Sequence, residues 1–239
     1  MGGAMVDALR MVRYSLRDFW DEFVPLVLMN LLWSLTAALP VLVLFVLKDI
    51  DPVLRLAISS LLTLPVLVVT GALCFVTNQL SRGETANWGL FGMGVRRYWA
   101  KSLAVGFINI AALLLWASNL QFYAAVLEGA WANIVLSLWL VAGFYWALVQ
   151  IFWFPTILEL ENEKVLLGLR NAVLMVIVSP GFSITLGLVL LLIGALCVFL
   201  SVPAVLVMTS FLLLVTNHAT RSRLAMAQKK PYKPGLDGD

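Results

Sequence analysis

The sequence predicts an all-α, polytopic membrane protein: a bundle of six transmembrane helices with amphipathic helices at the membrane surface. The first observation is composition, because 62% of the 239 residues are hydrophobic and only 12% are charged, whereas soluble domains have roughly 45–50% and about 25%. The second is a series of long apolar runs, and the third is a one-sided distribution of lysine and arginine. Together these observations exclude a soluble enzyme, a disordered chain and a disulfide scaffold.

The first element is an amphipathic helix over residues 1–22, expected to lie in the membrane interface. Its arginines, Arg10, Arg13 and Arg17, fall on a face of their own, and the acidic side chains of the segment argue against a cleaved signal peptide. The apolar positions recur at helical spacing: Met5, Leu9, Val12, Leu16 and Phe19.

Residues 23–220 form the predicted transmembrane domain. A helix needs about 20 mostly apolar residues to cross the hydrocarbon layer. Four runs have that length: 23–47, 54–80, 102–127 and 130–158. The uncharged stretch 180–219 is too long for one span and is divided near Ser201-Val202-Pro203, because proline is favoured in the first turn of a helix. None of these runs alternates apolar and polar residues as the strands of a membrane barrel do.

Two further amphipathic helices are expected at the surface, near residues 86–101 and 163–178. Each combines an apolar stripe at helical spacing with basic residues elsewhere on the helix. The basic segment 221–239 follows the last span and is expected to be a disordered tail, since it is polar and contains two prolines and two glycines.

The basic residues predict the orientation. Fourteen of the 16 lysines and arginines fall on the side of the two termini, and only Lys48 and Arg55 fall on the other. Positively charged loops remain in the cytoplasm, so we expect a multi-pass protein of the plasma membrane with both termini cytoplasmic. The same arginines and lysines are expected to contact anionic lipid headgroups rather than nucleic acid.

Short motifs recur along the chain. Phe19-Trp20 and Asn30 reappear 79 residues later as Tyr98-Trp99 and Asn109, and Val76-Thr77-Asn78 reappears as Val215-Thr216-Asn217. This pattern predicts three parallel repeats of about 80 residues, each an interfacial helix followed by a transmembrane hairpin.

A larger set of motifs resembles the YesL-like family of bacterial integral membrane proteins. The resemblance covers roughly residues 5–225, and its motifs are Asn30-Leu31-Leu32-Trp33, Pro65, Arg82-Gly83-Glu84, Arg96-Arg97-Tyr98-Trp99, Phe152-Trp153-Phe154-Pro155, Gly168-Leu169-Arg170-Asn171-Ala172 and Ser179-Pro180-Gly181. The family is a domain of unknown function that is often encoded beside carbohydrate-uptake genes. The resemblance therefore implies six spans and an association with carbohydrate uptake, and it carries over no active residues.

The sequence contains no recognisable catalytic motif, and neither a cofactor nor a metal is expected. Several amides lie within predicted spans, and four of them are candidates for a polar cavity between repeats: Asn30, Asn109, Asn119 and Gln150. An unpaired amide is costly in hydrocarbon, so these side chains either line such a cavity or form hydrogen bonds between helices. An aromatic stripe, Trp139, Trp146 and Trp153, recurs every seven residues. It serves either sugar stacking or ordinary packing and lipid contact.

Two functions follow as hypotheses. The first is a non-enzymatic accessory or assembly component of carbohydrate uptake, with a membrane or transporter protein as partner. The second is a small transporter or channel with a polar site between the repeats. A continuous polar cavity at Asn30 and Asn109 would favour transport, whereas an apolar core with an uncovered groove would favour a partner protein.

Overall fold

The computed structural model describes residues 2–127, 129–230, 232 and 234, and this part of the chain is almost entirely helical. The all-α prediction is confirmed. In chain order the helices are α1 (Gly2–Asp21), α2 (Phe23–Val46), α3 (Pro52–Ser81), α4 (Trp88–Val126), α5 (Gly129–Glu159), α6 (Val165–Val178), α7 (Pro180–Leu200), α8 (Val202–Leu206) and α9 (Met208–Ala227).

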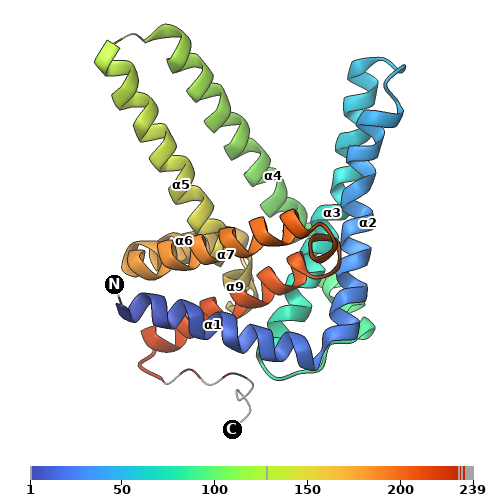
Figure 1. The fold of residues 1–239 in the computed structure, drawn as a ribbon, viewed down its shortest axis with the longest axis vertical. Helices are drawn as coiled ribbons and strands as arrows, with labels where there is room; N and C mark the ends of the chain where they lie inside the picture. Colours follow the sequence, from blue (N-terminus) through green and yellow to red (C-terminus); the bar gives the residue numbers. More distant parts are fainter. Residues whose placement is uncertain (1, 128, 231, 233, 235–239) are drawn as a thin grey trace.

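Two upright helical hairpins, α2–α3 and α4–α5, rise from a layer of helices that lies across their lower ends (Figure 1). We call this layer, formed by α1, α6, α7 and α9 with the lower ends of the hairpins, the base. The turn of the first hairpin is set locally: the Asp51 carboxylate accepts hydrogen bonds from the N–H groups of Val53 and Leu54, and Pro52 starts α3. These are strong signals for a helix N-terminus.

The core of the molecule lies in the base. Its largest fully buried side chains come from helices far apart in the sequence and include Leu26, Met29, Leu73, Phe152, Trp153, Ile157, Leu186 and Leu214. Gly71 lets α3 and α4 approach closely, because a Cβ atom there would lie 1.8 Å from the Ser102 hydroxyl oxygen. The base therefore fixes the relative positions of the two hairpins.

The predicted surface helix near 86–101 is helical but is not a separate element. It continues into the third span as α4, a single 39-residue helix that begins at the Asn87 cap. No proline or cap interrupts the sequence between the two segments, which explains the continuity. The helix predicted near 163–178 is confirmed as α6, which packs against α5.

Within the described residues, five helices are long and apolar enough to cross a membrane: α2, α3, α4, α5 and α7. The chain is therefore a multi-pass membrane protein, but a count of six spans is not confirmed. The predicted break near Ser201 is confirmed, because α7 ends at Leu200 and Pro203 lies in the first turn of α8. α7 lies across the base instead of standing upright (Figure 1).

The prediction of a disordered tail from residue 221 was wrong for its first part. α9 continues to Ala227, and Arg221 and Ser222 are buried. Hydrogen bonds and ion pairs to the rest of the base hold these residues, and composition alone did not reveal those partners. Residues 231, 233 and 235–239 lie outside the described part of the chain.

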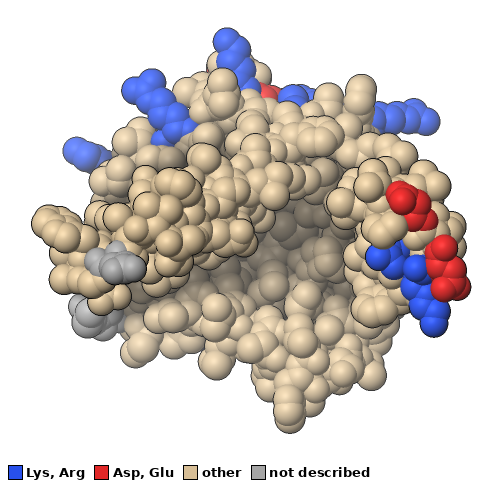
Figure 2. Space-filling model, turned by 90° about the horizontal axis from the view of Figure 1, so that it is seen from above, with Lys and Arg blue, Asp and Glu red and all other residues tan. Residues whose placement is uncertain are grey.

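The outer parts of the two hairpins diverge and leave a hollow between them (Figures 1 and 2). On the face drawn in Figure 2, the visible walls of this hollow carry no lysine, arginine, aspartate or glutamate, and the charged residues in view lie along the upper edge and at the right of the molecule. Residues 107–126 of α4 and 129–147 of α5 include no buried side chain. Their surroundings are therefore lipid or another protein.

The structure agrees with the predicted repeats in the first two copies more than in the third. Each of the first two contributes an upright hairpin, and in each a tryptophan donates across that hairpin: Trp33 to Thr70 Oγ1 (2.8 Å) and Trp116 to the Trp139 carbonyl (2.7 Å). The third copy differs, because α7 and α9 belong to the base and do not form an upright hairpin (Figure 1).

Candidate functional site at the base of the bundle

The two copies of the Val-Thr-Asn motif meet where α9 crosses α3. Asn78 Nδ2 donates to Asn217 Oδ1 (3.2 Å), and Asn217 Nδ2 donates to Thr77 Oγ1 (3.0 Å). Both asparagines are almost completely buried. Buried amides must find hydrogen-bond partners, and each amide here finds a partner in the other motif. The sequence repeat therefore corresponds to a physical contact.

Glu159, at the end of α5, is the centre of a buried polar cluster beside this crossing. Its carboxylate accepts hydrogen bonds from Asn78 (2.7 Å) and Arg82 (2.8 Å), and Arg221 lies 3.8 Å away. The Arg221 side chain is 4% exposed and also donates to the Ser81 carbonyl. Burial lowers the pKa of Arg221, while the nearby Tyr232 and Glu159 oppose that shift. The cluster joins α3, α5 and α9.

Glu163, in the turn between α5 and α6, forms a second cluster with the lower part of α4. It accepts a hydrogen bond from the Tyr98 hydroxyl (2.6 Å) and forms ion pairs with Arg97 (2.7 Å) and Lys101. Burial alone would raise the pKa of the Glu163 carboxyl, but the hydrogen bonds from Lys101 and Tyr98 outweigh it and hold the pKa below its ordinary value. Its φ of 47° places the residue in the left-handed region, so these contacts hold a strained turn.

A polar cleft of about 510 Å³ opens between the two clusters. The ends of α3 and α5 and the first turns of α4 form its walls. Its charged side chains are Arg82, Glu84, Arg97, Glu159, Glu161 and Glu163, and its apolar ones include Phe75, Leu90, Met93 and Leu158. Its volume lies within the range of small-molecule pockets, although its lining is more polar than is usual for them. We call it the base cleft.

The lowered pKa of Glu163 predicts acid sensitivity. Its charged form contributes stability above the unfolded carboxyl pKa, and this contribution is lost as the pH falls through the folded value. At pH 7 we expect Glu163→Gln to cost about 1–3 kcal/mol, the range for hydrogen bonds to charged groups. Thermal unfolding in detergent should show this difference shrinking below about pH 4. Glu161→Gln is the matched control, and a difference that is constant with pH would contradict the prediction.

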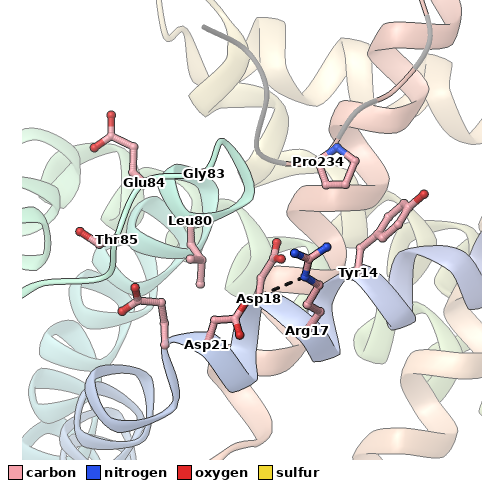
Figure 3. Close-up of a pocket in the computed structure, with 10 residues that line it drawn as sticks. Tyr14, Arg17, Asp18, Asp21, Leu80, Gly83, Glu84, Thr85 and Pro234 are labelled. Atoms are coloured by element: carbon pink, nitrogen blue, oxygen red, sulfur yellow. Dashed lines mark ion pairs between the residues drawn. The ribbon is translucent and has the colours of Figure 1, made fainter.

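A second pocket, of about 240 Å³, lies between the end of α1 and the α3–α4 turn (Figure 3). Asp18, Asp21, Glu22 and Glu84 surround it, and Arg17 lies 4.0 Å from Asp21. His218 is completely buried behind it and pairs with Asp18 (2.9 Å) and the Tyr232 hydroxyl (2.5 Å). These contacts fasten α1 to α9. Despite these acidic residues, no three or more His, Cys, Asp or Glu side chains in the described part of the chain are placed so that they could hold a metal ion together.

Among the four predicted amides, Asn30 has a defined role. Its Nδ2 donates to the Val205 carbonyl (2.7 Å), and its Oδ1 accepts from the Ser210 N–H (2.8 Å). Ser34 also donates to the Val205 carbonyl (2.8 Å). Asn30 therefore satisfies backbone groups that the break between α8 and α9 leaves without helical partners.

The structure does not bring the four amides into one cavity. Asn109 accepts a hydrogen bond from Trp146 (3.1 Å) across the second hairpin, while Asn119 and Gln150 donate to carbonyls of their own helices. Within the described chain, none of the four bonds to another. For Asn30 and Asn109 the contacts are interhelical hydrogen bonds, one of the two roles considered from the sequence.

The three tryptophans of the predicted stripe have different surroundings. Trp153 is fully buried and donates to the Val165 carbonyl (3.0 Å), and Trp146 packs against it edge to face. Trp139 and Trp146 line an apolar groove of about 460 Å³ between α4 and α5, together with Trp116, Gly143 and other uncharged residues. The stripe therefore runs from the core of the base to an open groove.

Comparison of the chain with protein-family models, with curated proteins and with solved structures finds no match. The candidate site therefore rests on the geometry of this chain.

Sequence reasoning missed the carboxylates that organise the base cleft. Glu159 and Glu163 follow the apolar run 130–158 and were not among the predicted site residues. The Val-Thr-Asn repeat was a usable signal for the crossing of α3 and α9, because the same motif ends two predicted spans. No sequence signal paired Glu163 with Tyr98, since 65 residues separate them.

Proposed function

We propose that the chain is a non-enzymatic membrane protein that acts as an accessory or assembly component, binding a transmembrane helix of a partner membrane protein. The resemblance to the YesL-like family would make this partner part of a carbohydrate-uptake system. The base would face the bacterial cytoplasm, with its exposed arginines and lysines on anionic headgroups. A reporter fused to the C-terminus that is accessible only from outside intact cells would overturn this orientation.

The apolar groove between α4 and α5 is the observation that carries the proposal. Its lining is uncharged, and the indole N–H groups of Trp116 and Trp146 are already bonded within the hairpin. The groove therefore offers aromatic faces and small residues such as Ala112 and Ala142. Small residues allow the close approach through which helices associate in lipid. A polar solute would find few hydrogen-bond partners on these surfaces, because Trp139 is the one lining tryptophan whose indole N–H is not bonded within the described hairpin.

Site-specific photo-crosslinking in native membranes tests the proposal. A photoreactive residue at Leu115, which lines the groove, should give one reproducible protein adduct. The control position is Leu61, which has a similar exposed fraction but lies on α3, away from the groove. Lipid adducts alone at both positions would refute the partner-helix proposal.

A small transporter is the second candidate, and the broken segment α8–α9 beside Asn30 favours it. Interrupted helices with polar groups at the break form substrate sites in many transporters. Proteoliposomes should then take up a sugar or an ion, and Asn30→Ala should abolish uptake while Asn109→Ala reduces it. An absence of uptake across a panel of sugars and ions would remove this candidate.

A further inference from the structure

The base cleft has the composition of an amphipathic headgroup site. Its apolar residues come mostly from α3, α4 and α5, which are all long enough to span a membrane, and its charged residues lie where α3 and α5 end and on the lower part of α4. The cleft therefore lies at one end of the membrane-spanning helices. A ligand bound there would have its polar group among the charges and an apolar part toward the lipid.

Two arginines in the cleft retain donors for a ligand. Arg82 uses Nε on Asn78 and one terminal nitrogen on Glu159, and its Nη1 has no hydrogen-bond partner in the described chain. Arg97 pairs with Glu163 through Nη2, and its side chain is 57% exposed. A guanidinium has five N–H donors in a planar fork that fits phosphate oxygens. Both arginines can thus bind a phosphate without releasing their carboxylates.

The cleft also contains two carboxylates that can bind a positively charged group of a ligand. Glu84 and Glu161 are exposed and form no ion pair with other described residues. Four glutamates and two arginines line the same space, and Arg221 and Lys101 pair with Glu159 and Glu163. The cleft therefore offers both signs of charge to a ligand. A group that carries both a phosphate and an ammonium matches this arrangement.

We propose that the base cleft binds a phosphate–ammonium zwitterion, the headgroup chemistry of an aminophospholipid. Arg82 and Arg97 hold the phosphate, and Glu161 accepts hydrogen bonds from the primary ammonium. The proposal does not depend on a partner protein, because it concerns the base and not the groove between α4 and α5.

Thermal unfolding in detergent, with added short-chain lipids, tests the site. Phosphatidylethanolamine should raise the melting temperature at lower concentration than phosphatidylcholine or phosphatidylglycerol of the same chain length. The choline ammonium has no N–H donor, and phosphatidylglycerol lacks the positive charge. Free phosphoethanolamine shows whether the natural ligand is a lipid or a soluble molecule. If it raises the melting temperature as much as phosphatidylethanolamine does, the ligand is soluble. If it raises the melting temperature much less, the ligand is the lipid. Equal effects of all three lipids would overturn the proposal.

Matched variants locate the binding. Loss of one hydrogen bond to a charged group corresponds to about a tenfold or greater loss of affinity, so Arg97→Gln and Glu161→Gln should each weaken phosphatidylethanolamine binding by that factor. Arg96→Gln is the control, because Arg96 is the exposed neighbour that does not line the cleft. Glu161 has no ion pair to lose, so a folding defect cannot explain its effect. Unchanged affinity in both cleft variants would refute the site.

Discussion

Replacing Glu159 with leucine is expected to lower the free energy of unfolding by about 3–5 kcal/mol, the cost of removing one partner from a buried ion pair. The variant leaves Arg221, which is 4% exposed, without this carboxylate, and it removes an acceptor from Asn78 and Arg82. Thermal or denaturant unfolding of the purified protein in detergent measures the loss. Because the cluster joins α3, α5 and α9, the transition should stay cooperative but move to lower temperature.

A double variant shows whether losing the interaction between Glu159 and Arg221 causes this destabilisation. Glu159→Leu combined with Arg221→Leu should recover part of the stability, since apolar replacement of a whole buried pair is often neutral or stabilising. Glu161→Leu changes the same residue type two positions away on an exposed site and should alter stability by less than about 0.5 kcal/mol. A double variant no more stable than Glu159→Leu alone would show that the interaction between Glu159 and Arg221 is not the source.

Trp153→Ala should also destabilise the protein by about 3–5 kcal/mol, as expected for the loss of a large buried aromatic side chain. Trp153 is completely buried, packs against Trp146 and donates to the Val165 carbonyl at the start of α6. The variant should therefore loosen α6 from α5, and hydrogen exchange should rise first in residues 165–178.

The matched control for this variant is Trp131→Ala, because Trp131 has the same side chain but is 72% exposed near the tip of the second hairpin. We expect little change in unfolding there. Equal destabilisation by both variants would mean that the base is not the stabilising core. Uniform hydrogen exchange across α5 and α6 would contradict the particular role of Trp153 at their contact.

Helix content and span length were predictable, because they depend on local composition. The runs that became α2, α3 and α5 differ from their expected bounds by a few residues, and the break at Ser201 was visible from Pro203. The position of α7 was not predictable. Its uncharged sequence suits a span, but its placement across the base depends on contacts with α1, α5 and α6 that no local pattern encodes.

The candidate residues show the same division between local and long-range information. The sequence indicated that Asn30 and Asn109 need partners, because amides in hydrocarbon are costly when unpaired. It did not indicate which partners, and Asn30 meets a broken backbone 175 residues away. The sequence shows each charged residue of the base cleft. It does not show that these residues meet, because their meeting depends on the convergence of three helix ends.

The unbroken α4 has a mechanical consequence. A helix of 39 residues without a proline is about 58 Å long, so it behaves as a stiff lever that pivots where Gly94 and Ser102 are packed in the base. A tilt of about 10° at that pivot would displace the far tip by several ångströms, by simple geometry on this length. Any event that repositions the Arg97–Glu163 contact is thereby amplified on the opposite side of the membrane.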